Sequence, residues 1–253
     1  YLDAALKLSF RCAEVIKNRE TANGDTDSQV IALKKYNAYV TIFCDQIDRR
    51  LLKGETIPAG EKIFSIFEPD TEWITKGKLG KNVELGHLLL ITTDNNQFIV
   101  DYKVMEKEKD HAQVKPLIKR LEEQYPNVKI KSHSFDKGFS SKENKEALLA
   151  GKVEHVVLPK KGKLNQKEKE EESQLLFVKL RHAHSAVESN INMLEHHGLS
   201  RCMDKGTKHY KRNVGLSVLA YNLHIIGNKI KADEIKRQLL LRKQRERYHK
   251  NAA

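Results

Sequence analysis

The stretch Lys129-Ile130-Lys131-Ser132-His133-Ser134-Phe135-Asp136-Lys137-Gly138-Phe139-Ser140 decides how the fold is interpreted. In its first half Ile130, Ser132 and Ser134 alternate with the residues between them, which is the period-two pattern of a β-strand. Asp-Lys-Gly then predicts a tight turn, and a helix is expected from Ser140 or Ser141. Asp136 would therefore stand at the carboxyl end of a strand, where α/β folds place their ligands. The same tripeptide is also ordinary turn chemistry, so the alternative of a plain turn residue stays open.

The segments around this stretch predict an α/β fold with strands in mixed directions. Before it, hydrophobic periodicity indicates strands followed by a helix that Pro126 closes, and after it a short helix and one more strand. The strands are expected at 63–67, 83–92, 97–105 and 153–158, and the helices at 110–125 and 141–150.

The two ends of the chain are expected to be helical. Residues 1–53 have apolar side chains at helical spacing in two runs, which predicts a helical hairpin. After a charge-dense segment at 160–172, one long helix is expected over 174–196 and a last core helix over 210–226. Residues 229–253 then form a basic tail.

Composition points to an anionic partner. The 253 residues include 46 Lys and Arg against 34 Asp and Glu, a net charge of +12, and such an excess is typical of nucleic-acid binding. The three cysteines lie far apart without a Cys-x-x-Cys pair, which argues for a reducing compartment and against a disulfide scaffold or a cysteine zinc site. No apolar run reaches the roughly 18 residues of a membrane span. We therefore expect a cytoplasmic protein with no membrane partner.

Two carboxylates are candidates for metal-dependent phosphodiester chemistry. That chemistry needs carboxylates from separate elements that converge on metal ions about 3.5–4 Å apart, and Mg²⁺ prefers such oxygen ligands. Asp136 at a strand end and Glu188 on the helix expected over 174–196 form a candidate pair. Glu188 lies beside the apolar stripe of that helix, on the same flank as His184. A single glutamate on a helix is nevertheless most often a surface residue.

A series of short segments runs in order along most of the chain and carries a family resemblance. They are Gly54-Glu55-Thr56-Ile57-Pro58, Phe64-Ser65-Ile66-Phe67-Glu68-Pro69, Thr71-Glu72-Trp73-Ile74-Thr75-Lys76-Gly77-Lys78, Val83-Glu84-Leu85-Gly86, Phe135-Asp136-Lys137-Gly138-Phe139, Val157-Leu158-Pro159-Lys160-Lys161-Gly162, His184-Ser185-Ala186-Val187-Glu188-Ser189 and His197-Gly198-Leu199-Ser200-Arg201-Cys202. Together they resemble the insertion-sequence DDE transposases of bacteria, specifically the unclassified ISNCY-type group.

This resemblance implies an RNase H-like catalytic core, a mixed sheet with flanking helices, preceded by a helical hairpin. Residues 1–53 would be the end of an insertion domain, 54–228 the core without its first strand, and 229–253 a basic tail. Asp136 would match the second acid of the catalytic triad and Glu188 the third. The first acid would lie upstream of Tyr1, and weaker candidates within the chain are Glu68, Asp70 and Glu72.

The resemblance also implies an activity and its partners. The complete enzyme would use Mg²⁺, with Mn²⁺ as the alternative, to cleave the ends of an insertion sequence and join them to target DNA. The chain alone is expected to be an inactive fragment. Its partners would be the terminal inverted repeats and target DNA, bound by a homodimer in the nucleoid of a bacterial cytoplasm. Side chains expected to contact DNA are Lys76, Lys78, Lys81, Lys160, Lys161 and His184.

Other interpretations remain open. The absent first acid fits an inactive or domesticated DNA-binding remnant of a transposase. A generic basic RNA-binding protein fits the net charge, but it predicts exposed aromatic side chains for base stacking, whereas the aromatics here fall mostly on apolar stripes. A zinc site would need ligand spacing that the histidines lack; these are His182, His184, His196 and His197.

Overall fold

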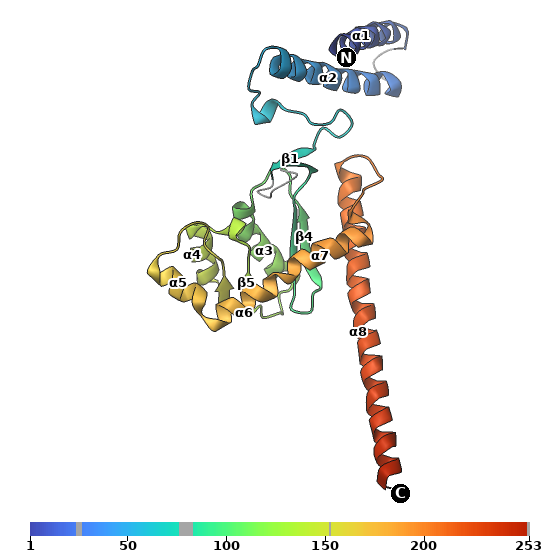
Figure 1. The fold of residues 1–253 in the computed structure, drawn as a ribbon. Helices are drawn as coiled ribbons and strands as arrows, with labels where there is room; N and C mark the ends of the chain where they lie inside the picture. Colours follow the sequence, from blue (N-terminus) through green and yellow to red (C-terminus); the bar gives the residue numbers. More distant parts are fainter. Residues whose placement is uncertain (24–26, 76–82, 152, 252–253) are drawn as a thin grey trace. The chain divides into compact units, whose positions relative to one another are not determined.

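The computed structural model shows helices and short strands that form two compact units (Figure 1). The first unit contains residues 1–88 with 205–209, and the second contains 89–204 with 210–253. The structure describes residues 1–23, 27–75, 83–151 and 153–251, without the side chains of 22, 23, 59, 186, 188 and 246–251. Within those ranges no helix combines the length and the apolar character that crossing a membrane requires.

The first unit begins with the expected helical hairpin, made of α1 (Leu2–Asn23) and α2 (Ser28–Ile47). The Asp27 carboxylate caps α2 by accepting the Gln29 N–H at 2.8 Å, which satisfies one of the backbone donors that a helix start leaves unpaired. Ser9 of α1 donates a hydrogen bond to Asn37 of α2 at 2.8 Å. A short π-helical turn, η1 (Asp48–Leu52), ends the second helix.

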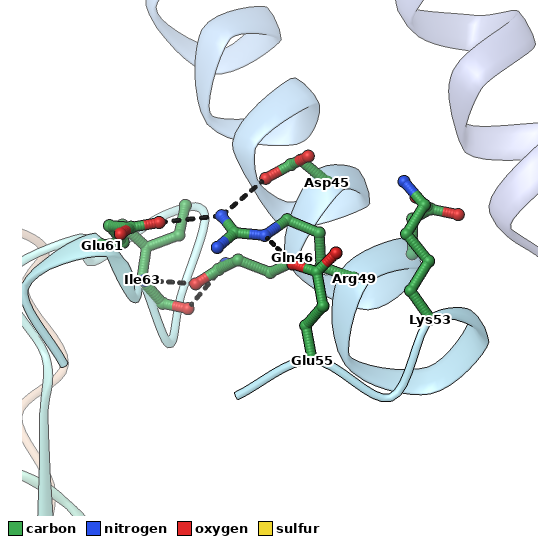
Figure 2. Close-up of polar contacts among 8 residues, drawn as sticks. Asp45, Gln46, Arg49, Lys53, Glu55, Glu61 and Ile63 are labelled. Carbon is green, nitrogen blue, oxygen red and sulfur yellow. Dashed lines mark hydrogen bonds and ion pairs between the residues drawn. The ribbon is translucent and has the colours of Figure 1, made fainter. Parts of the chain in front are cut away.

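Two polar side chains at the end of the hairpin hold the segment that follows it (Figure 2). The Arg49 guanidinium lies 3.4 Å from Asp45, 2.9 Å from Glu55 and 2.8 Å from Glu61. The Gln46 amide bonds both backbone groups of Ile63, accepting its N–H at 2.8 Å and donating to its C=O at 3.3 Å.

The Gln46 contact explains why the strand expected over 63–67 is absent. A strand needs its backbone N–H and C=O groups for a ladder, and those of Ile63 bond a side chain instead. The antiparallel pair in this unit is formed by β1 (Glu72–Thr75) and β2 (Val83–Gly86). The single strand expected over 83–92 is also wrong, because β2 ends at Gly86 and a new strand begins at Leu89.

The second unit has two separate strand pairs within the described ranges. Strand β3 (Leu89–Thr93) pairs antiparallel with β4 (Ile99–Val104). Strand β5 (Ser132–Ser134) pairs parallel with β6 (His155–Val157). The mixed strand directions are confirmed, but the strands form two-stranded sheets rather than one continuous sheet.

Helices surround these strands in the second unit. In chain order they are η3 (Asp110–Gln113), α3 (Val114–Gln124), η4 (Lys137–Phe139), α4 (Lys142–Ala150), α5 (Gln166–Ser173), α6 (Leu175–His184), α7 (Ala186–Leu194), η5 (Glu195–Leu199) and α8 (Thr207–Asn251). The first three residues of α8 group with the first unit. The helix expected to end at Ile226 instead continues to Asn251, through Lys, Arg, Gln and Leu residues that favour helix.

The long helix expected over 174–196 is interrupted at Ser185. Its hydroxyl donates to the His182 carbonyl at 2.6 Å, and its backbone N–H bonds the same carbonyl at 3.2 Å. A serine that bonds the backbone of the preceding turn commonly bends a helix. Helix α6 therefore ends at His184, and α7 starts a new segment at Ala186.

Two apolar clusters pack on opposite faces of the β3–β4 pair. Leu90 of β3 packs with residues from α3, α4 and the end of β5, whereas its neighbours Leu89 and Ile91 pack with residues from α7 and α8. This alternation follows from the period of two along a strand. In Figure 1, α3 lies on one side of β4, and α7 and α8 lie on the other. The second unit is thus a layered α/β structure that places α7 next to the strands.

Candidate active site

Asp136 lies where the sequence predicts, just beyond the carboxyl end of β5. The turn after it is made by the backbone, since the Asp136 carbonyl accepts the Phe139 N–H at 3.1 Å, and the carboxylate makes no capping bond. The side chain is 78% exposed. Asp136 therefore supplies a negatively charged group that the turn itself does not use.

Gly138 permits a close approach within this turn. A β-carbon at this position would lie 2.8 Å from the Asp110 carboxylate, which belongs to η3. Two short helical turns, η3 and η4, therefore meet where a larger residue would push the Asp110 side chain aside.

His184, the last residue of α6, lies next to Asp136. Its Nε2 atom lies 3.3 Å from the Asp136 carboxylate, and its side chain is 22% exposed. This contact pairs opposite charges when the imidazole carries a proton. The structure thus brings together two residues that the sequence analysis proposed for different roles.

Glu188 lies in α7, one residue after Val187, and its side chain is outside the described part of the structure. Val187 and His184 both line a cleft of about 170 Å³ between β3, β5 and α6, which we call the β3–β5 cleft. The backbone of Glu188 is therefore adjacent to the same cleft. The predicted meeting of its carboxylate with Asp136 stays a prediction.

Two polar residues of the β3–β5 cleft were missed by the sequence analysis. Asp94 lines the cleft, and its carboxylate accepts the N–H groups of Asn96 and Phe98 at 2.8 and 2.9 Å. Ser134 also lines it, and its hydroxyl is buried without a partner among the described residues. Asp94 looked like a hairpin residue and Ser134 like a strand residue, so neither gave a local signal of a shared cleft.

A buried polar network fixes α7 against the tip of the β3–β4 hairpin. The Asn190 amide donates to the Gln97 side chain at 3.0 Å, and the Tyr221 hydroxyl of α8 lies 2.9 Å from the Asn190 oxygen and 2.8 Å from the Gln97 carbonyl. Asn222 bonds the N–H and C=O of Ile99, each at 2.9 Å. Since Asn190 lies two residues after Glu188, this network sets the position of the helix that carries Glu188.

The three weaker in-chain candidates for a first acid have structural partners inside the first unit. Both oxygens of Glu68 accept the Gly206 N–H, at 2.9 and 3.1 Å. Asp70 accepts the Thr207 hydroxyl at 2.7 Å. Glu72 lies 3.0 Å from the His87 ring. These contacts hold the 205–209 segment and the β1–β2 pair.

The predicted DNA-contacting lysines fall into two groups. Lys76, Lys78 and Lys81 lie outside the described residues. Lys161 is exposed, whereas the Lys160 ammonium is paired with Glu168 at 2.7 and 2.8 Å. Lys160 is therefore engaged within the chain, which the charge pattern alone did not indicate.

The residues described around Asp136 suit a hard cation only in part. Carboxylate and hydroxyl oxygens are the donors that Mg²⁺ takes. Asp136 offers an exposed carboxylate, and Ser134, two residues earlier in the chain, has a buried hydroxyl without a partner among the described residues. Among the side chains the structure describes, no three His, Cys, Asp or Glu residues gather into a metal-binding group. These donors are of the kind that Mg²⁺ takes, and the assignment of Glu188 and a first acid as further ligands stays a prediction.

The chain belongs to the family of transposase DDE domains. The sequence model described as "Transposase DDE domain" matches residues 28–223, well over half of the chain, and the match includes Asp136, His184 and Glu188. The resemblance to DDE transposases is thereby confirmed. The family consists of polynucleotidyl transferases that act on DNA and generally use divalent metal ions. The comparisons with curated proteins and with solved structures gave no match.

The buried His133, which precedes Ser134 in β5, is expected to make the stability of the second unit depend on pH. Burial lowers the pKa of His133, and the charge of Glu122 opposes this only in part. Below a pH of about 6.5, His133 of the unfolded chain therefore binds a proton, whereas burial disfavours the protonated imidazole in the folded state. The contribution of neutral His133 to the free energy of unfolding is fully present above that pH. As the pH falls, the free energy of unfolding decreases by up to about 1.4 kcal/mol per pH unit.

Urea unfolding between pH 7.5 and 5 checks this expectation. The His133→Leu variant is expected to lose less stability over this range than the unaltered chain. Replacing the exposed His196 by glutamine is the matched control and is expected to leave the pH dependence as it is. Equal acid sensitivity of the His133→Leu variant and the unaltered chain would contradict the assignment.

Proposed function

We propose that the chain is the carboxy-terminal catalytic part of an insertion-sequence transposase of the ISNCY-type group. The complete enzyme cleaves the ends of its element and joins the resulting 3′-OH to target DNA. One observation carries this proposal beyond the family: the exposed Asp136 carboxylate at the end of β5 lies 3.3 Å from His184, immediately before the helix with Glu188. That arrangement allows a strand-end acid and a helix acid to face one substrate.

An RNase H-like core without its first strand is the arrangement we infer for residues 54–228. In the described ranges β3 and β5 each pair along one edge only, and residues of both strands line the β3–β5 cleft. Unpaired strand edges are templates for a further strand. A strand placed there would join the two pairs into one mixed sheet and bring a first acid beside Asp136. Residues 1–53 would then end an insertion domain, and 229–253 would be a basic tail.

The roles of the catalytic residues follow from this arrangement. Asp136 and Glu188 would hold Mg²⁺, or Mn²⁺ in its place, together with a first acid from the added strand. When bound, the metal ions stabilise the entering and leaving oxygens of an in-line displacement at phosphorus. His184 holds the Asp136 carboxylate in place and presents a donor to the DNA end. Glu68, Asp70 and Glu72 make structural contacts within the first unit, so they are the weaker candidates for that first acid.

A strand-transfer assay on the full-length protein tests the proposal. The substrates are a labelled duplex with the element's terminal repeat and a plasmid target. Joined products are expected with Mg²⁺ and not with EDTA, and residues 1–253 alone are expected to give none. The terminal inverted repeats, the target DNA and a homodimer are the partners we propose. Stable binding of the repeat with no cleavage under any divalent ion would favour the inactive remnant instead.

A further inference from the structure

Helix α5 is attached to the second unit by charge rather than by apolar packing. None of its residues, Gln166–Ser173, is buried. Glu168 pairs with Lys160 at 2.7 and 2.8 Å, and Glu171 pairs with Lys145 of α4 at 2.6 Å. Glu172 accepts the Lys160 backbone N–H at 2.9 Å. These carboxylates at i, i+3 and i+4 share one side of the helix.

The lysines that pair with these carboxylates line a common cleft. It has a volume of about 600 Å³ and lies between α4, the end of β6, α5 and α6. Its cationic lining consists of Lys142, Lys145, Lys160 and Lys161, and we call it the lysine cleft. The glutamates of α5 line the same cleft, so they neutralise a surface that would otherwise present several positive charges together.

The lysine cleft adjoins the candidate active site. The turn after Asp136 contributes Phe139 to the β3–β5 cleft and Ser140 to the lysine cleft. Helix α6 contributes His184 to the first and Phe177 to the second. The same turn and the same helix therefore contribute side chains to both clefts.

We propose that the four lysines of the lysine cleft bind the phosphate backbone of duplex DNA, and that helix α5 covers them with its carboxylates until DNA displaces it. The proposal rests on the proposed function in taking DNA as the ligand. A carboxylate pairs with an ammonium as a phosphate does, so α5 and DNA compete for Lys145 and Lys160.

The free energies of these interactions favour displacement of α5 by DNA. An exposed ion pair changes an equilibrium constant by at most about fivefold, and an isolated helix shorter than about 12 residues is marginal in water. DNA instead contacts several lysines at once and releases counterions from each phosphate that is neutralised. Lys160 also lowers the pKa of Glu168, so the carboxylate carries its charge at neutral pH, when it competes with phosphate.

Charge-neutral variants of α5 test the competition. E168Q/E171Q removes both charges that pair with lysine, and glutamine at position 168 keeps the capping box with Asn165, because glutamine serves this role as well as glutamate. We expect it to bind a random-sequence duplex about five- to tenfold more tightly at about 0.15 M salt. The matched control is E143Q/E170Q, which removes two exposed charges from α4 and α5 and is expected to gain less than about twofold.

Two further measurements make the outcome decisive. In a K145Q/K160Q background, E168Q/E171Q is expected to gain no more than the control pair. Hydrogen exchange of the α5 amides is expected to become faster when the duplex is added to the unaltered full chain. Equal gains in both double variants, slower or unchanged exchange in α5, or no duplex binding by any variant would each overturn the proposal. All of these use EDTA and DNA without a terminal repeat, so failure of strand transfer is a separate result.

Discussion

Replacing Asp136 by asparagine is expected to reduce strand transfer by the full-length protein by up to about a thousandfold. Removing a single group that stabilises transition-state charge costs up to about this factor in other enzymes, and asparagine keeps the shape of the side chain while it removes the charge that holds a cation. The measurement is the rate of joined product under saturating Mg²⁺.

The exposure of Asp136 separates this catalytic effect from folding. Its side chain is 78% exposed and makes no capping bond, so the free energy of unfolding should change by less than about 0.5 kcal/mol. Glu143→Gln, an exposed carboxylate in the first turn of α4, is the control and should keep normal activity. Full activity of the Asp136→Asn variant would remove Asp136 from the catalytic centre.

The largest loss of stability is expected from Arg120→Met. The Arg120 guanidinium of α3 bonds both oxygens of Asp101 in β4, at 3.2 and 2.8 Å. The Asp101 side chain is only 4% exposed, so removing Arg120 leaves a buried carboxylate without its partner. Breaking one side of such a pair typically costs about 3–5 kcal/mol, and urea unfolding of the chain measures it.

Two controls define the cause. The Arg212–Asp204 pair has a shorter contact, 2.6 Å, but both side chains are at least half exposed, so Arg212→Met should cost at most about 1 kcal/mol. The double variant Asp101→Leu/Arg120→Met should recover most of the stability, because replacing both members of a buried pair by apolar groups is often neutral. A double variant as unstable as the single one would show that the lost charge pair is not the cause.

Much of the candidate site could be read from local sequence. The alternation over 130–135 and the Asp-Lys-Gly turn place Asp136 at the end of a strand, and the structure has β5 and η4 there. His184 was found because it shares a helix flank with Glu188, although as a DNA contact rather than as a neighbour of Asp136. These inferences succeeded because strand periodicity and turn chemistry act over a few residues.

Other features depend on partners that are distant in sequence. Ile63 is not in a strand because Gln46, which lies 17 residues earlier, bonds its backbone. Asp94 and Ser134 share a cleft only after β3 and β5 come together. The local sequence around Lys160 suggests a free basic side chain, but in the structure Lys160 is paired with a glutamate of α5.

By itself, the sequence determined the family, the order of most elements and the place of Asp136 at a strand end. Only the tertiary structure decided that His184 contacts Asp136, that a polar network fixes α7 against the hairpin, and that glutamates of α5 pair with lysines of the lysine cleft. The physical reason is the range of the interactions. Hydrophobic period and turn propensity are properties of neighbouring residues, whereas a hydrogen bond or ion pair needs two groups whose distance only the folded backbone sets.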